Sequence, residues 1–339
     1  MLSIKEIAEK MGVNPNAVRF YEKKGLLTPE RTKTNYRLYS NEDMAKLEMI
    51  MLYRKMGFSI EDIQKLLLHK QENLEHFVLQ YSALNHHIHS MEQIRETLGG
   101  CIEKQLNGEL LEEEIMEQIA ETAKSIALSE NWKDQWGFDH MASQYDTMIR
   151  QKGMGLDFYK NYDEVLKRTA LKMKKGIIAE IGIGTGNLAQ KILDMVKDIE
   201  QYIGVDQSLN MLKEAKKKCK NIFLRKGDFL NLPLEANSCD GIVTSYAFHH
   251  CDHIEKELAI KEMDRVLKQN GMIVITDLMF QNQNERQKYE LSCKKEELLD
   301  LEDEFFGNVD EIFPMLESFG YQCIAEQVDE LIWIITAKK

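Results

Sequence analysis

The chain has 339 residues, which is too long for one ordinary hydrophobic core and predicts two domains with a connector. Its composition is 43% hydrophobic and 29% charged, with 4 prolines and 19 glycines, which excludes disordered and fibrous proteins and favours a helix-rich globular one. The net charge of -12 argues against nucleic-acid binding by the chain as a whole.

The charge is unevenly distributed along the chain. Residues 1–70 carry a net charge of +4, which leaves -16 for the remainder of a chain of net charge -12. A basic head on an acidic body favours nucleic-acid binding by the head alone. No apolar run marks a signal peptide or a membrane span, and the six cysteines form no C-x-x-C pair, so we expect a cytoplasmic protein with free thiols and no membrane contact.

Two short helices are predicted in the first 25 residues. Apolar residues at helical spacing end at Gly12, and Asn14 then caps a second helix with Pro15 at its first position. The second helix would present polar and basic side chains outward: Asn16, Arg19, Lys23 and Lys24. Two helices joined by a tight turn predict a helix-turn-helix, although any small helical bundle contains such pairs.

The continuation supports the helix-turn-helix hypothesis. Residues 35–39 (NYRLY) alternate like the returning strand of a small basic hairpin, with Arg31 and Lys33 near its tip. The segments IKEIAEKMGVNPNAVRFYEKKGLLTPERTKTNYRLYS and LYRKMGFSIEDIQKLL resemble the MerR family of bacterial transcription regulators over about residues 2–70. The resemblance implies a winged helix-turn-helix that binds operator DNA. The DNA-facing residues would be Asn16, Arg19, Tyr21, Lys33, Tyr36 and Arg37; either tyrosine could instead belong to the core.

A coiled-coil seam follows, in which apolar residues recur at alternating steps of three and four: Leu74, Phe77, Tyr81, Leu84, Ile88, Met91 and Leu98. The MerR resemblance implies a homodimer through helix 72–98. An acidic helical stretch from residue 101 to 130, after Gly99 and Gly100, is interpreted as a linker. Three histidines crowd the long helix (86, 87 and 89), but without a cysteine or carboxylate at matching spacing we expect a solvated face rather than a metal site.

A glycine-rich loop lies in the second half, where residues 179–188 read AEIGIGTGNL. An apolar run (GIIAEI) precedes it and a helical pattern (LAQKILDMV) follows, so backbone N–H groups of the loop would face an anion. Asp206 ends the next strand, at the position that binds ribose hydroxyls in nucleotide-binding folds. Up to this point NAD and S-adenosylmethionine fit equally.

Three features favour S-adenosylmethionine. The NAD fingerprint would need glycine where the chain has Asn187, whereas Glu180 before the first glycine resembles the E/D-x-G-x-G-x-G motif of class I S-adenosylmethionine methyltransferases. Further matching segments follow in order: VDQSLNML, KGDFLNLPL, DGIVTSYAFHH and GMIVITD. The resemblance covers about residues 132–339 and implies a Rossmann-like seven-stranded sheet with helices on both faces. The expected fold is therefore α + α/β, with domains at 1–70, 71–130 and 131–339.

The resemblance assigns cofactor roles by position. The three glycines would allow close approach of the methionine portion, Glu180 would hold its ammonium through the loop or a water, and Asp206 would accept from both ribose hydroxyls. Asp228 would accept from the adenine amino group, and FDHMASQYDTM would cover the cofactor. The full set of expected cofactor residues is Tyr145, Glu180, Gly182, Gly184, Gly186, Asp206, Gln207, Met211, Asp228, Phe229 and Ser245, with Asp146 beside Tyr145.

Methyl transfer is an in-line displacement, so the enzyme supplies positioning, and a base where the nucleophile carries a proton. His249 and His250, just past the fourth strand of the predicted sheet, are the candidate catalytic residues, as a general base or substrate contacts, with plain loop packing as the alternative. We predict no metal there, because the potential ligands in FHHCDH are nearly adjacent and a tetrahedral site rarely takes more than two from such a run.

The acidic C-terminal half lacks an N-P-P-Y type motif, so a small-molecule methyl acceptor is favoured over a nucleic acid. The expected partners are operator or promoter DNA, RNA polymerase at the promoter and that acceptor. Two hypotheses remain open. In the first, a working methyltransferase is coupled to a transcription regulator; in the second, an inactive methyltransferase-like domain only senses S-adenosylmethionine, S-adenosylhomocysteine or another ligand. The intact cofactor motifs favour the first.

Overall fold

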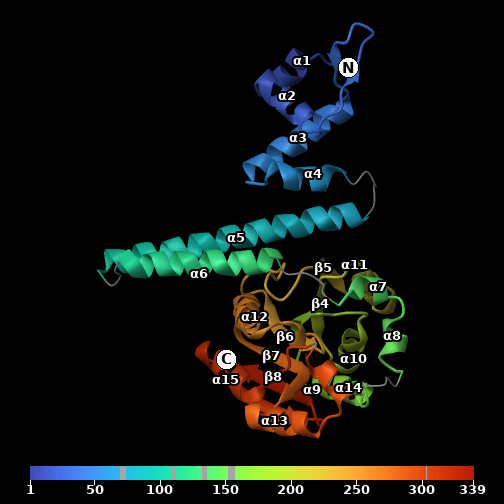
Figure 1. Cartoon of the computed structure of the whole chain (residues 1–339), viewed down its shortest axis with the longest axis vertical. Coiled ribbons are helices and arrows are strands. Elements are labelled where there is room, and N and C mark those ends of the chain that lie inside the picture. Colours follow the sequence, from blue (N-terminus) through green and yellow to red (C-terminus); the bar gives the residue numbers. More distant parts are fainter. Residues whose placement is uncertain (69–73, 109–111, 132–135, 152–156, 303) are drawn as a thin grey trace. The chain divides into compact units, whose positions relative to one another are not determined.

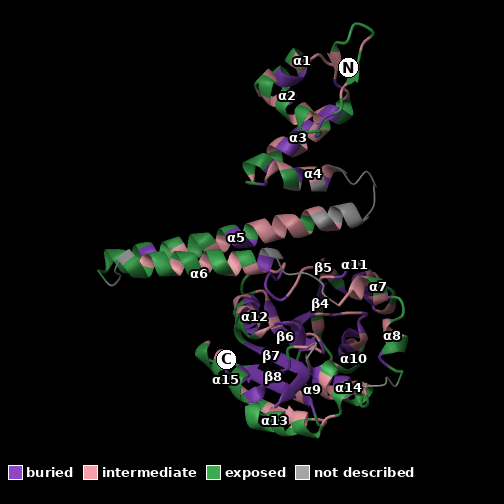
Figure 2. Ribbon diagram, viewed as in Figure 1, coloured by how far each residue is buried: buried purple, intermediate pink, exposed green. Residues whose placement is uncertain are grey.

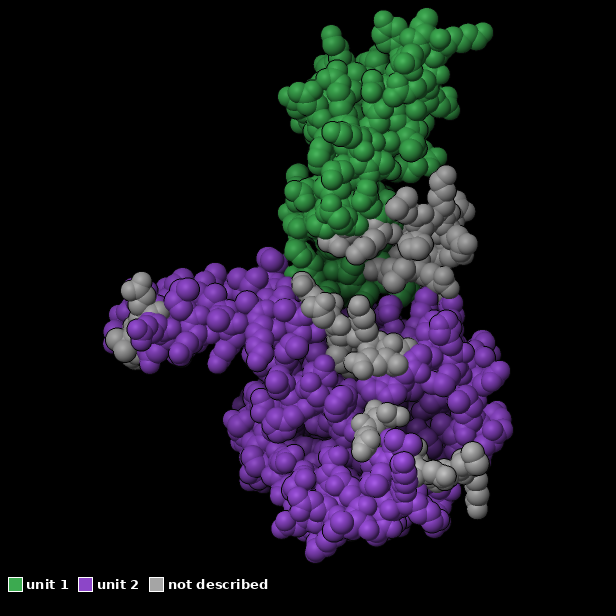
Figure 3. Space-filling model, in the orientation of Figure 1, with its two compact units in different colours: residues 1–87 green, residues 88–339 purple. Residues whose placement is uncertain are grey.

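The computed structural model describes residues 1–68, 74–108, 112–131, 136–151, 157–302 and 304–339. The chain divides into two compact units, residues 1–87 and 88–339 (Figures 1 and 3). The expected three-part division at residues 70 and 130 stays a prediction. In the described part of the chain, no helix has both the length and the apolar character needed to cross a membrane.

The first unit contains short helices and a two-stranded hairpin: α1 (Ile4–Lys10), α2 (Pro15–Lys23), β1 (Glu30–Arg31), β2 (Arg37–Leu38), α3 (Asn41–Lys55) and α4 (Ile60–Leu68). The expected start of α2 is confirmed, since the Asn14 side chain accepts a hydrogen bond from the Asn16 N–H at 2.8 Å. The hairpin is antiparallel, with Arg31 paired to Arg37. Buried side chains of α1 to α4 and Tyr39 form the core of this unit. Figure 2 colours the buried residues of the ribbon purple.

Helix α5 (Leu74–Leu106) is longer than expected, because it continues through Gly99 and Gly100 instead of ending there. It is followed by α6 (Glu112–Asn131), and a hydrogen bond of 2.7 Å between the hydroxyls of Thr97 and Thr122 joins the two helices. The predicted start of the dimerisation helix, residues 72 and 73, lies outside the described residues, as do the side chains of Leu74 and Phe77 and residues 110 and 111 of the acidic stretch.

The expectation of a solvated histidine face on α5 is wrong. In the first unit, the His87 ring packs against the Phe58 ring, with centroids 5.0 Å apart. In the second unit, His89 is buried and its Nε2 lies 3.2 Å from the Glu262 carboxylate. Burial lowers the pKa of His89 in spite of this carboxylate, which favours a neutral imidazole. Packing therefore explains the placement of these two histidines.

The second unit is built on a mostly parallel sheet in the order β5-β4-β3-β6-β7-β10-β9. The strands are β3 (Gly176–Ile181), β4 (Ile199–Asp206), β5 (Phe223–Lys226), β6 (Cys239–Ser245), β7 (Leu267–Phe280), β8 (Gly307–Asn308), β9 (Gln322–Gln327) and β10 (Ile332–Lys338). The expected antiparallel closing pair is present as β9 and β10. The seven expected strands are joined by the two-residue β8, which pairs with β7.

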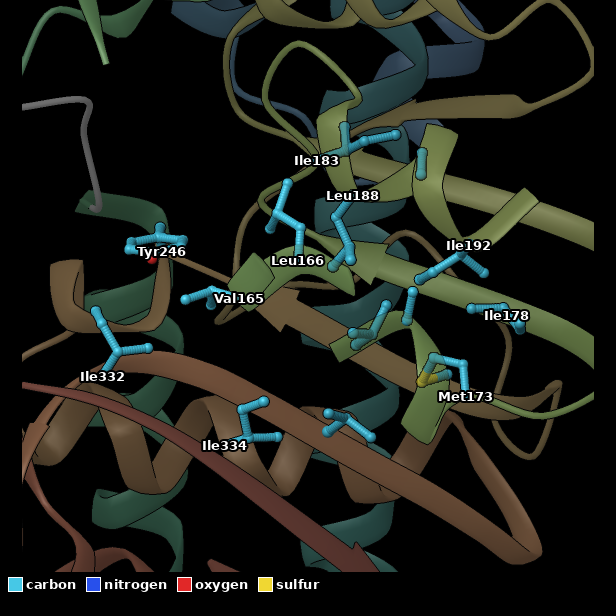
Figure 4. Packing of buried hydrophobic residues seen from close by; sticks show 14 of the residues in the cluster. Val165, Leu166, Met173, Ile178, Ile183, Leu188, Ile192, Tyr246, Ile332 and Ile334 are labelled. Carbon is cyan, nitrogen blue, oxygen red and sulfur yellow. The ribbon is translucent and has the colours of Figure 1, made fainter. Parts of the chain in front are cut away.

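Helices cover both faces of the sheet, as expected. They are α7 (Phe138–Met141), α8 (Tyr145–Met148), α9 (Tyr162–Lys172), α10 (Asn187–Met195), α11 (Leu209–Lys218), the 3-10 turn η1 (Phe248–His250), α12 (His253–Val266), α13 (Gln283–Ser292), α14 (Lys295–Glu302) and α15 (Val309–Ser318). One face packs against α9, α10 and α11 through residues such as Ile178 and Leu188 (Figure 4). The other packs against α12 and α15 through Ala179 and Ile260. Buried strands of this kind read as continuous apolar runs, which explains GIIAEI.

Candidate functional site

The glycine-rich loop lies between β3 and α10, at the carboxyl end of the central strand. Gly182, Gly184 and Gly186 all have positive φ values, of 71°, 54° and 82°. A Cβ added to Gly182 would lie 2.5 Å from the Cβ of Ala247, whereas one added to Gly184 would enter open space. The loop therefore requires glycine for its backbone conformation, and Gly184 in addition leaves space free beside it.

Asp206, the last residue of β4, supports this loop from the neighbouring strand. Its Oδ2 accepts a hydrogen bond from the Gly184 N–H at 2.8 Å, and its Oδ1 accepts one from the Ser208 N–H at 2.8 Å. The side chain lies at the pocket wall.

A pocket opens beside the loop and holds about 520 Å³ of space, counting its open mouth. Eight of the expected cofactor residues line it: Tyr145, Gly182, Gly184, Asp206, Gln207, Met211, Asp228 and Phe229. The carboxylate of Asp228 accepts from the N–H groups of Leu230 and Asn231, yet burial raises its pKa to about 7. The structure therefore gathers the expected cofactor residues of four separate sequence segments into one cavity.

Three expected cofactor residues do not line the pocket: Glu180, Gly186 and Ser245. Glu180 is buried beneath the loop, where its carboxylate accepts a hydrogen bond of 2.5 Å from the Tyr202 hydroxyl. Burial raises the pKa of Glu180 to about 8. Its position supports the loop from below.

Two aspartates bind the segment that precedes the sheet to the loops around the pocket. The sequence analysis did not predict this role for either of them. Asp146, in α8, accepts from the side chains of Thr185 at 2.6 Å and Asn187 at 2.9 Å, both from the glycine-loop segment. Asp139, in α7, accepts from the Ser208 hydroxyl at 2.7 Å, next to Asp206. The lead-in helices thus hold Tyr145 and Phe138 at the pocket wall.

The candidate catalytic histidines lie in η1, directly after β6, and both are buried. His249 is oriented by Asp277 of β7, whose Oδ1 lies 2.5 Å from its Nδ1. Asp277 also accepts hydrogen bonds through Oδ2 from the backbone N–H groups of residues 247 to 249, which fixes the turn. Burial is the largest single influence on the pKa of His249 and lowers it, but the charge and the hydrogen bond of Asp277, together with the charge of Glu304, outweigh burial and raise the pKa.

His250 belongs to the pocket wall, whereas His249 does not. The Trp136 ring packs on the His250 ring, with centroids 4.1 Å apart, and the Phe138 ring lies 5.0 Å from it. Burial lowers the pKa of His250 to about 4, so its imidazole is neutral at pH 7. Glu304, which sequence reasoning missed, lies beside both histidines, with Oε2 3.2 Å from the His250 Nδ1.

The expected DNA-facing residues lie in the first unit, on α2 and at the hairpin. Asn16, Arg19, Lys33 and Tyr36 are exposed. Arg37 is half-buried and forms an ion pair of 2.5 Å with Glu22, which also pairs with Arg31. Tyr21 packs against the core of the unit. The structure therefore leaves four of the six expected residues exposed.

Comparison with protein families gives two matches. A model of the MerR HTH family regulatory protein matches residues 2–70, and a model of a methyltransferase domain matches residues 179–275. A methyltransferase from Oceanobacillus iheyensis is 32% identical over 207 residues, which is 60% of this chain and 95% of the relative. One from Alkaliphilus oremlandii is 35% identical over 212 residues, with the same coverage. Both relatives are described as uncharacterized methyltransferases.

Similar solved structures include the DhpI-SAM-HEP complex, with 15% identity, a TM-score of 0.46, and coverage of 60% of this chain and 94% of that one. A SAM-dependent methyltransferase from Thermotoga maritima, described as a possible histamine N-methyltransferase, has 21% identity and a TM-score of 0.43, with coverage of 60% and 97%.

Proposed function

Because the chain belongs to the methyltransferase family and carries a MerR-type helix-turn-helix region at its N-terminus, we propose that it is a DNA-binding transcription regulator whose second unit binds S-adenosylmethionine and methylates a small molecule. The observation that carries the proposal is the shared pocket of the glycine loop, Asp206 and Asp228. It unites an anion-facing loop with two carboxylates in one cavity.

The donor set fits S-adenosylmethionine. The free space at Gly184 accommodates the methionine portion close to the backbone, and the Asp206 carboxylate, which lies in the pocket wall, would accept from the two ribose hydroxyls. Asp228 is placed to accept from the adenine amino group, with Phe229 and Met211 in the same wall. The aromatic rings of Phe138, Tyr145 and Tyr246 also line the pocket, and such rings attract a cationic sulfonium.

Glu180 acts indirectly in this proposal. Since it lies beneath the loop and bonds to Tyr202, it holds the loop in shape instead of contacting the cofactor ammonium. Of the two roles that the family resemblance implied, through the loop or through a water, this proposal takes the first.

The cofactor, when bound, would supply a methyl group on a positively charged sulfur. The contribution of the chain is to position the acceptor and keep water away from it. His250, Tyr246 and Ala247 form the part of the wall next to η1, where the acceptor would lie. His249 stands behind His250 and is held by Asp277, so the pair of histidines is fixed before the acceptor binds.

The first unit would bind DNA through its exposed polar residues. Arg19 and Lys33 are available for phosphates or guanine edges, and Tyr36, which is 73% exposed, for a phosphate. Arg37 would first have to exchange its ion pair with Glu22 for a phosphate. At a promoter, a protein bound in this way would meet RNA polymerase.

We propose that the active form is a homodimer formed through α5. This helix exposes apolar side chains at Tyr81 and, from residue 88 on, at steps of three and four: Ile88, Met91, Ile94, Leu98, Ile102 and Leu106. Exposed apolar side chains at steps of three and four are typical of a helix that pairs with another helix. We propose that a second copy of the chain covers these apolar side chains, because a dimer presents two recognition helices to two half-sites on DNA.

Calorimetric titration of S-adenosylmethionine into the full-length protein tests the central proposal. We expect one site per chain, and a loss of at least about tenfold in affinity in Asp206→Ala, because a polar contact to the ribose is worth on the order of 1 kcal/mol or more. Asp194→Ala, at an exposed position of α10, is the matched control. Absence of binding by the wild type would contradict the proposal.

Transfer is tested separately, with S-adenosylmethionine that carries a labelled methyl group and a fractionated extract of small metabolites. Transfer of the label to a small molecule would support the proposal that the second unit is an active methyltransferase. Tight cofactor binding without transfer to any fraction, together with a change in DNA affinity, would favour the ligand-sensing alternative.

A further inference from the structure

No metal is expected from the FHHCDH run alone, because such a run supplies at most two ligands. With Glu304 as a third ligand from another segment, we propose that His249, His250 and Glu304 form a binding site for a divalent cation of the zinc class beside the proposed methyl-transfer pocket. The three side chains come from η1 and from the segment after α14, so 54 residues separate His250 from Glu304 in the sequence. Among the described residues, these form a group of three potential metal ligands, because one ligand atom of each lies within 4.8 Å of those of the other two.

The spacing of these atoms suits a tetrahedral ion. The Glu304 Oε2 lies 3.2 Å from the His250 Nδ1 and 3.8 Å from the His249 Nε2. Zinc bonds of about 2.0–2.2 Å in tetrahedral geometry place two ligand atoms about 3.3–3.5 Å apart. Small side-chain rotations would therefore bring the three atoms into the first coordination sphere.

Two of the three ligand atoms are buried without a satisfied hydrogen bond. Among the described residues, neither the Nδ1 of His250 nor the Oε2 of Glu304 forms a hydrogen bond of acceptable geometry, despite their separation of 3.2 Å. His250 itself is only 9% exposed. Because an unsatisfied buried polar atom is costly, two such atoms aimed at one point indicate a missing partner.

Asp277 supplies the outer support that metal-binding histidines require. Its Oδ1 lies 2.5 Å from the Nδ1 of His249, which leaves Nε2 as the free ligand nitrogen on the side of Glu304. Histidine ligands almost always donate their second N–H to a carboxylate, a carbonyl or water. Backbone N–H groups hold Asp277 in turn, so the His249 ring is oriented before an ion arrives.

The charges around the site are favourable on balance. The buried ammonium of Lys256 opposes a cation, but it is engaged by the carbonyl oxygens of Cys251 and Phe305. The carboxylates of Asp277 and Glu304, which lie next to the two histidines, contribute negative charge that favours a cation. The ligand set of one carboxylate and two imidazoles also matches the preference of zinc.

The protein provides three ligands, which leaves a fourth position open, as in catalytic zinc sites. Since His250 belongs to the wall of the pocket, an oxygen or sulfur atom of the methyl acceptor would occupy that position. This last step rests on the proposed function; binding of the ion does not.

The test is calorimetric titration of chelator-treated full-length protein with zinc chloride. We expect one ion per chain for the wild type, and at least tenfold weaker binding in Glu304→Gln and His250→Ala. Asp277→Asn should weaken binding by ten- to a hundredfold through His249. His253→Ala is the matched control, because this exposed histidine has a comparable neighbour, Glu257, 3.9 Å away on α12. Its zinc affinity should equal that of the wild type.

Equal zinc affinity in the wild type, Glu304→Gln and His250→Ala would overturn the proposal, as would absence of binding by the wild type. Circular dichroism of each variant identifies any that fail to fold, and Glu304→Gln keeps the shape of the side chain. Titration of S-adenosylmethionine into the metal-free protein runs in parallel. Cofactor binding without zinc binding would reject the metal site alone, whereas zinc binding without cofactor binding would reject the methyl-transfer proposal alone.

Discussion

The ammonium of Lys218, at the end of α11, lies 2.8 Å from the carboxylate of Asp146 in α8 and donates a hydrogen bond to it. The two residues are 72 positions apart in the sequence. Together with Thr185 and Asn187, this pair ties the segment before the sheet to the glycine loop. The position of the pocket wall at Tyr145 therefore depends on a partly buried polar cluster outside that wall.

Replacing Asp146 by alanine should release the lead-in helices from the loop. We expect the affinity for S-adenosylmethionine to fall about tenfold, because loss of these hydrogen bonds costs on the order of 1–2 kcal/mol in the closed state. Calorimetric titration measures it. Asp163→Ala removes an ion pair of 3.4 Å with Lys191 at the surface and should leave the affinity unchanged. Equal affinities of the two variants would argue against the fastening role.

Gly184→Ala should abolish cofactor binding with a small loss of stability. The new methyl group enters the open space beside the loop, and the φ of 54° adds strain of about 1 kcal/mol. The matched control is Gly320→Ala, where φ is 86° and the Cβ also meets open space, but outside the pocket. Thermal melting should show similar losses in both variants, and a titration should show lost binding only in Gly184→Ala.

Stability should fall as pH rises through the neutral range because of Glu180. The Glu180 carboxyl has a pKa of about 8 in the folded protein, against the ordinary value of 4.5 that applies in the unfolded chain. Between these values the unfolded chain has released the proton and the folded protein retains it, so a rise in pH favours unfolding. The contribution is on the order of 1–3 kcal/mol.

Scanning calorimetry of the wild type and Glu180→Gln at several pH values measures this effect. The glutamine cannot titrate, so the variant should lose less stability than the wild type between about pH 5 and pH 8. Glu164→Gln, at an exposed position on α9, should follow the wild type. Parallel curves for the wild type and Glu180→Gln would show that the buried carboxyl does not titrate in this range.

Arg19→Ala should weaken DNA binding and reduce its salt dependence. If the guanidinium neutralises one phosphate, the slope of log K against log salt falls by about one unit. A duplex selected from a random pool by the wild-type protein is a suitable probe in a fluorescence anisotropy assay. Lys46→Ala, on α3, removes a cation already paired with Glu42 at 2.7 Å and serves as the control. An unchanged slope would remove Arg19 from the DNA contacts.

Met91→Glu with Leu98→Glu should convert the proposed dimer into a monomer. These side chains are 49% and 47% exposed on α5, and a pair of negative charges in a helix seam is repelled by its twofold mate. Sedimentation velocity measures the change in mass. Leu291→Glu, at an apolar residue on α13 that is 88% exposed, should leave the mass unaltered. A wild-type monomer at micromolar concentration would contradict the proposal directly.

Most of the fold was predictable because its signals are local. The start of α2 follows from Asn14 and Pro15, and β3 from an apolar run that ends in a glycine loop. The length of α5 was not, because glycines that usually end helices are accepted at Gly99 and Gly100 at a cost of about 1 kcal/mol each. The burial of His89 depends on Glu262, which lies far away in the sequence.

The site was predictable to the extent that motif residues themselves line it, as Asp206 and Gly184 do. Glu180 stands apart because a motif gives the position of a residue but not the direction of its side chain. Glu304 and Lys218 carry no local signature at all. They reach the site through tertiary packing, and a single sequence offers no spacing from which to infer such a contact.

The indole of Trp136 packs against the imidazole of His250, so the intrinsic fluorescence of this tryptophan reports on the site. Any event that changes the charge or position of that imidazole changes the surroundings of the neighbouring indole and hence its emission. The chain has three tryptophans, so removal of the other two would leave a single fluorophore next to His250. Ligand and metal arrival could then be timed in a stopped-flow instrument without an added dye.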